Sequence, residues 1–359
     1  MKVITTPVAT FEIPYYRFLD PQGIPEQTLP AFAQDPDYLI SLYRMMLLTR
    51  LFDKKAIALQ RTGKIGTYPS NLGQEGLGVG IGAAMLAQDI FVPYYREYGT
   101  QFWRGVKMEE ILLYWGGDER GSCFENTPQD FPLCVPIASQ TLHAAGAAFA
   151  VKYRKEKKVV VTVVGDGGTS RGDFYEAMNF AGAWELPVVF VINNNQWAIS
   201  VARSAQTKAH TLAQKAIAAG LPGIQIDGND VIAVNHAVKE AVEQARQGGG
   251  ASVIEALSYR MGDHTTADDA TRYRQNEEKA HYEQADPVMR LKNYLSAQGY
   301  WDETREQALL ATLTETVQAA ADNFEKITPQ PVSAMFDYLY ETLPQAYQAQ
   351  REAVIKGAV

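Results

Sequence analysis

A carboxylate and a carboxamide stand at the ends of two apolar stretches of this sequence. Asp166 follows the run VVVTVVG and lies among glycines, and Asn194 and Asn195 end the run PVVFVINNN. Both runs are typical of strands buried in a parallel sheet, and ligands of such sheets bind beyond the carboxyl ends of the strands. If the two strands are neighbours, a carboxylate oxygen and an amide oxygen meet at one edge. Such oxygen ligands suit Mg²⁺, which often shares its coordination shell with phosphate.

The glycines around Asp166 suit a phosphorylated ligand. Gly165, Gly167 and Gly168 let a diphosphate approach the main chain, and a helix that begins beyond them adds unpaired N–H groups. Taken singly, a Gly-Asp-Gly turn and an asparagine-rich strand end are common structural features, but the pair at this spacing favours a ligand site. The segment GDGGTSRG lacks the Gly-x-Gly-x-x-Gly pattern, which argues against an NAD-dependent dehydrogenase.

The composition is that of an ordinary globular protein. Of 359 residues, 46% are hydrophobic and 21% are charged, and 33 basic against 41 acidic residues give a net charge of −8. This balance disfavours nonspecific binding to nucleic acid or to an anionic membrane. No apolar run reaches the roughly 20 residues of a membrane span, and the first residues lack the order of a signal peptide, so we expect a cytoplasmic protein. Cys123 and Cys134 match no zinc-ligand spacing, and we expect both to be reduced.

Alternating apolar strands and amphipathic helices predict the elements that must hold these residues. The pattern is that of an α/β fold, an open and mostly parallel sheet with helices on both faces. We expect a proline-rich extended arm over residues 1–37, an α/β domain over 38–280, and a helical segment over 281–359 packed on the same domain. Helices are predicted near 35–63, 73–87, 139–158, 173–184, 204–220, 231–247 and 286–299, followed by a long amphipathic run to about Phe324. The glycines of residues 73–87 predict a helix that packs closely against another backbone.

The combined segment from Gly165 to Ser200 resembles a known cofactor motif. GDGGTSRGDFYEAMNFAGAWELPVVFVINNNQWAIS is similar to the thiamine diphosphate motif, Gly-Asp-Gly followed by Asn-Asn. The closer resemblance is to alpha subunits of the decarboxylase component of 2-oxo acid dehydrogenases. SNLGQEG, YYREYGTQFWRG, VPIASQ, LPGIQIDGND and YRMGDHTTADDATRYR occur in that family's order, so the resemblance covers roughly residues 38–302.

The resemblance implies a cofactor site built around a metal ion. Asp166 and Asn195 would hold Mg²⁺ by their side chains, and Trp197 by its carbonyl, at a position where tyrosine or phenylalanine is common. A guanidinium suits the diphosphate because it donates two bonds at once. The remaining positions that the resemblance assigns to thiamine diphosphate are Tyr95, Arg96, Val135, Ile137, Gly167, Gly168 and Ile199.

His264 is the one histidine for which the sequence favours catalysis. It lies in SYRMGDHTTADDATRYR, after a predicted strand and among many charged residues. An imidazole titrates near neutrality and can stabilise or protonate intermediates. In the resembling family this loop closes over the cofactor and the matching histidine contacts the reaction centre. Thr265 matches a regulatory phosphoserine of mitochondrial relatives, but that regulation is not carried over.

The chain lacks one part that thiamine chemistry requires. In the family, a glutamate that activates the cofactor comes from a separate beta subunit; Glu75 is a weak candidate for that role. The resemblance therefore implies a beta subunit as partner, in an alpha2beta2 heterotetramer, and a lipoyl domain of the acyltransferase component that receives the acyl group. Alone, the chain should be inactive.

The substrate stays open among 2-oxo acids. The resemblance is closest to bacterial pyruvate dehydrogenase alpha chains, but branched-chain 2-oxo acid and acetoin dehydrogenases share nearly as much. Some pyruvate-specific members have a histidine near position 69, where this chain has Pro69. Branched-chain members also lack that histidine. A noncatalytic scaffold that kept the fold is the alternative from another class. Retention of Asp166, Asn195, Arg96 and His264 argues against it.

Overall fold

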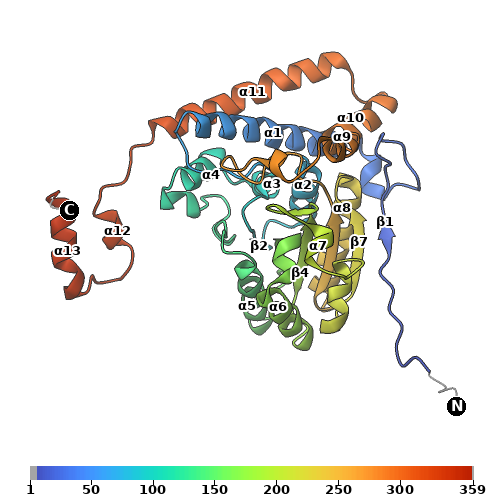
Figure 1. Cartoon of the computed structure of the whole chain (residues 1–359), viewed down its shortest axis with the longest axis horizontal. Coiled ribbons are helices and arrows are strands. Elements are labelled where there is room, and N and C mark those ends of the chain that lie inside the picture. Colours follow the sequence, from blue (N-terminus) through green and yellow to red (C-terminus); the bar gives the residue numbers. More distant parts are fainter. Residues whose placement is uncertain (1–5, 358–359) are drawn as a thin grey trace.

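The chain folds around one six-stranded parallel sheet (Figure 1). The computed structural model describes residues 6–357, so residues 1–5 of the predicted arm and 358–359 of the C-terminal segment lie outside the described residues. In spatial order the strands are β1 (Tyr15–Tyr16), β7 (Gly223–Asp227), β8 (Ser252–Leu257), β4 (Val188–Asn194), β3 (Val160–Gly165) and β2 (Ile90–Val92). The predicted α/β fold is confirmed.

The two strands that carry the candidate ligands are direct neighbours. β3 and β4 pair in parallel, with Gly165 opposite Asn193. Asp166 therefore leaves the sheet from one strand at the same edge where Asn194 and Asn195 leave it from the next. This arrangement confirms the condition on which the predicted oxygen site depended.

Helices cover both faces of the sheet because successive strand residues point to opposite sides. Val160 and Val164 of β3 face α5 and α6, and Val161 and Val163 face α2 and α8. A second helical layer lies beyond α2, where α11 runs along α1 (Figure 1). The α-helices are α1 (Pro36–Arg61), α2 (Glu75–Ala84), α3 (Tyr98–Arg104), α4 (Met108–Trp115), α5 (Ser139–Tyr153), α6 (Gly172–Ala183), α7 (Arg203–Gln206), α8 (Val231–Arg246), α9 (Asn276–Glu283), α10 (Pro287–Ala297), α11 (Glu303–Lys326), α12 (Ala334–Asp337) and α13 (Gln345–Ile355).

Short elements complete the described chain. An antiparallel pair, β5 (Trp197–Ala198) and β6 (Val201–Ala202), follows β4 directly. Figure 1 shows α12 and α13 standing away from the sheet at the end of an extended segment. The 3-10 helices are η1 (Ala31–Gln34), η2 (Glu119–Ser122), η3 (Asp166–Ser170), η4 (Ala213–Ala219) and η5 (Ala270–Arg272).

The helix predicted over residues 204–220 is wrong. The structure has only the short α7 and η4 there. Between them, the guanidinium of Arg203 donates to the carbonyls of Ala209 and His210, which holds this segment as a loop. At the start of η4 the buried carboxylate of Glu255 accepts the N–H groups of Leu212 and Ala213. These side chains satisfy backbone groups that a continuous helix would have paired.

The N-terminal arm is more ordered than an extended segment laid on the surface. Tyr15 and Tyr16 add β1 to the edge of the sheet, in parallel with β7. Further along, the backbone N–H groups of Phe18 and Leu19 donate to the buried carboxylate of Asp230, at 2.7 and 2.8 Å. The arm is therefore tied to the core by backbone bonds that its irregular sequence did not predict.

The close packing predicted for the glycine-rich helix is confirmed. A Cβ atom on Gly80 would lie 2.6 Å from Cγ1 of Val234, on α8. Glycine is needed here because any side chain would push the two helices apart.

Two predicted absences can be compared with the structure. None of the described helices combines the length and the apolar character that crossing a bilayer requires. Cys123 and Cys134 are both free.

We expect opposite effects from two glycine-to-alanine changes in helices. Gly80→Ala should lower the free energy of unfolding by about 1–3 kcal/mol, because the new methyl group overpacks the contact with Val234. Gly146→Ala, on α5, should raise it by roughly 0.5–1 kcal/mol, because the open space there admits a methyl group and alanine favours the helix. Urea denaturation of the purified chain measures both; a shift of the same sign would contradict the packing argument.

Candidate active site

A pocket of about 230 Å³ opens at the carboxyl ends of β3 and β4. Nearly all of the predicted site residues line it, although they come from distant parts of the chain. Val135 is the exception: its side chain is 46% exposed and does not line the pocket. The predicted residues that do line it are Tyr95, Arg96, Ile137, Asp166, Gly167, Gly168, Asn195, Trp197, Ile199 and His264.

Asp166 begins η3 and is 2% exposed. Its Oδ2 accepts a hydrogen bond of 2.7 Å from Nε2 of Gln206, on α7. Burial raises the pKa of the Asp166 carboxyl to about 6, and the bond from Gln206 opposes that rise. A divalent cation beside it would favour the ionised form.

Asn195 is held so that its oxygen is free for a further partner. Its Nδ2 donates to Oε1 of Gln74 at 2.9 Å, and its Oδ1 accepts from the backbone N–H of Trp197 at 3.2 Å. A carboxamide oxygen has two lone pairs. One therefore remains for a cation.

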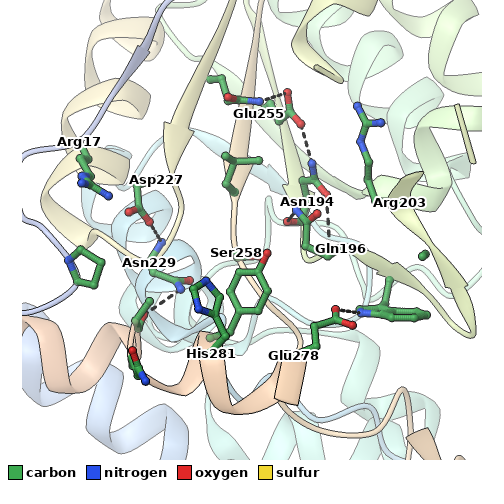
Figure 2. Close-up of a pocket in the computed structure, with 18 of the residues that line it drawn as sticks. Arg17, Asn194, Gln196, Arg203, Asp227, Asn229, Glu255, Ser258, Glu278 and His281 are labelled. Carbon is green, nitrogen blue, oxygen red and sulfur yellow. Dashed lines mark hydrogen bonds between the residues drawn. The ribbon is translucent and has the colours of Figure 1, made fainter. Parts of the chain in front are cut away.

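The preceding asparagine points away from this pocket. Nδ2 of Asn194 donates to Oε1 of Glu255 at 2.6 Å, and Figure 2 shows the two side chains directed toward one another with Gln196 beside them. They line a larger cavity of about 960 Å³ on the far side of Trp197. The alternation of strand side chains explains why neighbouring asparagines serve different faces.

Several charged groups of the larger cavity have partners within the chain. Arg290 pairs with Asp227 at 2.8 Å, and Arg17 pairs with Glu26 at 2.6 Å. Glu255 accepts hydrogen bonds from backbone and side-chain amides. Two of the arginines that line the larger cavity are thus paired with carboxylates of this chain, whereas Arg203 donates to backbone carbonyls.

The carbonyl of Trp197 completes a set of three oxygens around the smaller pocket. It accepts from Nη1 of Arg260 at 3.2 Å, which leaves one lone pair. Its indole Nε1 donates to Glu278 on the other side. In the described part of the chain no group of three or more His, Cys, Asp or Glu side chains could bind a metal. A cation here would rest on one carboxylate and on amide and carbonyl oxygens.

Gly167 and Gly168 are required by packing. A Cβ on Gly167 would lie 2.5 Å from Cβ of Ala198, and one on Gly168 would lie 2.5 Å from Cγ2 of Val164. The turn therefore fits against its neighbours only without side chains. The same absence leaves main-chain atoms on the pocket wall, as the sequence predicted for a diphosphate.

The backbone around the pocket is strained. Ala138, Gln196 and Ile199 adopt positive φ angles of 68°, 73° and 54°. Such angles are uncommon outside glycine, and for a β-branched residue such as Ile199 they are true outliers. Strain of this kind gathers at functional sites, where the surrounding structure enforces it.

Two buried guanidinium groups beside the pocket have no carboxylate partner. Arg96 is 3% exposed and donates to the carbonyls of Ser70 and His264. Arg260 is fully buried and donates to the carbonyls of Trp197 and Ile199. No described carboxylate forms an ion pair with either one. Because buried charges are normally paired, an anionic ligand such as a diphosphate would be stabilised beside these two groups.

His264 lies between these two guanidinium groups. Its Nδ1 is 3.2 Å from Nη2 of Arg96 and 3.3 Å from Nη1 of Arg260. A guanidinium only donates, so Nδ1 must be the acceptor and the ring proton lies on Nε2. Burial, together with the two positive charges, lowers the pKa of His264 to about 3. The predicted titration near neutrality is therefore wrong; the imidazole is a neutral N–H donor.

Glu75 is not placed to act on a ligand in the pocket. It is fully buried, pairs with Arg50 at 2.8 Å and accepts the N–H of Gly73. It does not line the pocket. The structure thus agrees with the sequence analysis, in which Glu75 was only a weak candidate for the activating glutamate.

Several residues of the site escaped the sequence reasoning. Tyr94, Cys134 and Gln140 line the pocket, and Gln74 and Gln206 hold the side chains of Asn195 and Asp166. Gln74 lies in SNLGQEG, which already carried the resemblance. Gln206 carries no such signal, because it reaches Asp166 only through the placement of the short α7 after the β5–β6 pair.

Comparisons with known proteins agree with this geometry. Residues 43–333 match the family model described as the dehydrogenase E1 component. The pyruvate dehydrogenase E1 component subunit alpha of Staphylococcus epidermidis is 40% identical over 358 residues, covering 98% of this chain and 95% of that protein. Its counterpart from Staphylococcus aureus strain Mu50 is 39% identical with the same coverage.

The neutral state of His264 can be measured. We expect the NMR signals of its imidazole to stay constant between about pH 5 and 8, because its pKa lies near 3. In the unfolded chain the ring titrates near pH 6.5, so this group makes stability fall as pH falls from about 6.5 toward 3. Arg96→Met removes one of the two charges and should raise the pKa. A titration near pH 6–7 in the wild type would contradict the arrangement.

Proposed function

Because this chain belongs to the dehydrogenase E1 component family, we propose that it is the alpha subunit of a pyruvate dehydrogenase. In this proposal it decarboxylates pyruvate and passes the acetyl group to a lipoyl domain, together with a beta subunit. The relatives from Staphylococcus carry the corresponding name over nearly the whole length of this chain. The observation that carries the proposal is the pair of buried, unpaired guanidinium groups beside three cation-binding oxygens.

These residues fit thiamine diphosphate with Mg²⁺. Asp166, the Asn195 amide oxygen and the Trp197 carbonyl would hold the cation. Arg96 would contact the diphosphate, whose negative charge supplies what the two buried guanidinium groups lack. When bound, thiamine diphosphate supplies the nucleophilic carbon and the electron sink for decarboxylation, and the protein supplies binding, orientation and electrostatics.

His264 contributes a fixed hydrogen-bond donor in this proposal. Its proton is held on Nε2, because Nδ1 accepts from Arg96 and Arg260. A neutral N–H donor in this position can stabilise negative charge that develops on a substrate oxygen. It does so without needing a proton from solvent at each turnover.

The pocket of the chain is incomplete, which supports a beta subunit. Among the described residues that line the pocket, Asp166 is the only carboxylate, which supports an activating glutamate from another chain. The volume of about 230 Å³ is below the roughly 300–1,000 Å³ of ligand sites. Ile137 and Ile199 stand at its rim with 46% and 56% of their surface exposed. A partner that covers these residues would close the site, in the alpha2beta2 assembly that the resemblance implies.

Fewer observations support the choice of pyruvate among the 2-oxo acids. Pro69 is buried, its carbonyl accepts from the hydroxyl of Tyr98 at 3.1 Å, and it does not line the pocket. It offers no polar group to a carboxylate substrate. Branched-chain 2-oxo acids and acetoin are therefore kept as alternatives within the same chemistry.

The ligand assignment is tested by Asp166→Ala in the chain assembled with its beta subunit. We expect activity and Mg²⁺-dependent binding of thiamine diphosphate to fall by at least about 100-fold, because the one carboxylate ligand is lost. Asp322→Ala, on the exposed face of α11, removes a carboxylate without touching the pocket and should change neither. Retained activity and metal dependence in Asp166→Ala would refute the assignment.

The substrate is tested by turnover of competing 2-oxo acids. We expect kcat/KM of the assembled enzyme to be higher for pyruvate than for 3-methyl-2-oxobutanoate, as the relatives' names indicate. The chain alone should turn over neither, because its pocket lacks the activating carboxylate. A preference for the branched substrate would redirect the proposal to that class, and activity of the isolated chain would contradict the need for a beta subunit.

A further inference from the structure

The side chain of Gln74 contacts two asparagines at the end of β4, Asn193 within the strand and Asn195 just after it. Gln74 precedes α2 and is 3% exposed. Its Oε1 accepts from Nδ2 of Asn193 at 3.0 Å and from Nδ2 of Asn195 at 2.9 Å. Both lone pairs of this one oxygen are therefore used by the amides of β4.

The direction of these bonds matters because the two ends of an asparagine amide differ. Only the oxygen can bind a cation; the NH₂ group has no lone pair to offer. If the Asn195 amide turned over, its oxygen would face Oε1 of Gln74, acceptor against acceptor. Its NH₂ group would face the N–H of Trp197, donor against donor. Of the two contacts that select the observed orientation, the one from Gln74 is shorter.

The observed orientation of the Gln74 amide leaves its own NH₂ group unpaired. Its Nε2 is buried and has no hydrogen-bond partner. Turning the Gln74 amide over would present that group to Asn193 and Asn195 in place of the acceptor that both need. Asn193 is itself fixed by Ser258, whose hydroxyl donates to Oδ1 at 2.6 Å. The unpaired donor is thus tolerated because the acceptor end is required.

We infer that Gln74 is a positioning residue for the metal site: it holds the Asn195 amide with its oxygen toward the cation. The inference rests on the proposed function, since it assumes that Asn195 is a ligand. It goes beyond that function because it says that Gln74, which does not itself bind the cation, determines that the oxygen of the Asn195 amide faces the cation. Supporting residues of this kind typically change metal affinity by roughly 10–100-fold when removed.

The test is a double-mutant cycle read out as Mg²⁺ affinity. The full chain is assembled with its beta subunit and titrated with Mg²⁺ by calorimetry in the presence of a fixed excess of thiamine diphosphate. Gln74→Leu should weaken Mg²⁺ binding by roughly 10–100-fold. In an Asn195→Asp background the same change should have little effect, because a carboxylate presents an oxygen whichever way it turns.

Two further variants separate positioning from folding. Gln74→Glu keeps an acceptor for both asparagines and should retain Mg²⁺ affinity close to that of the wild type. Gln101→Leu removes another buried glutamine, 1% exposed and without hydrogen-bond partners for either amide atom, on α3. It should leave Mg²⁺ affinity unchanged. Thermal unfolding of each assembly without Mg²⁺ shows how far stability changes alone account for the loss.

Each outcome has one meaning. A wild-type assembly that binds no Mg²⁺ would overturn the proposed function and this inference together. A wild type that binds, with Gln74→Leu unchanged, would overturn the inference alone. An equal loss from Gln74→Leu in the wild-type and Asn195→Asp backgrounds would also overturn it, as would a loss in Gln101→Leu as large as in Gln74→Leu, because neither result depends on the orientation of one amide.

Discussion

The parallel pairing of β3 with β4 is the constraint on which the whole site depends. With Gly165 opposite Asn193, the residues that follow each strand reach the same edge of the sheet. A slip of one residue would turn each side chain to the opposite face, so that Asn195 would take the direction that Asn194 now has. The apolar side chains of both strands lie in two separate cores, and these cores fix the register. The geometry of a few oxygens is thus set by the burial of many valines.

The charge of the site is balanced in a different way from that of the rest of the molecule. Elsewhere buried arginines have acidic partners, as Arg290 has Asp227 and Arg104 has Asp130. Arg96 and Arg260 instead donate to carbonyls, Arg260 donates also to the hydroxyl of Tyr273, and both contact His264. This arrangement explains two properties at once. It favours an anionic ligand beside the pocket, and together with burial it lowers the pKa of the imidazole between them.

The sequence predicted the fold and most of the site because both depend on local sequence patterns. Asp166 and Asn195 stand at the ends of apolar strands, and the paired strands bring them to one pocket, as expected. The state of His264 was not predictable, because its pKa depends on burial in the fold and on Arg96, which approaches from a distant part of the chain. The loop between α7 and η4 was mistaken for a helix because its apolar spacing gives no sign of the carboxylate of Glu255. Amide directions, such as that of Gln74, follow only from contacts in three dimensions.

The incompleteness of the pocket is itself a physical property with a consequence. A group that binds only the folded chain stabilises it in proportion to the logarithm of its concentration over its dissociation constant. In the proposed enzyme a diphosphate would neutralise the buried guanidinium groups, and a beta subunit would cover the exposed Ile137 and Ile199. Binding of the diphosphate removes the unpaired charge but leaves the apolar surface exposed. Binding of the beta subunit covers the apolar surface but leaves the charge unpaired. Because both meet at the same rim, we expect cofactor loading and subunit assembly to strengthen one another.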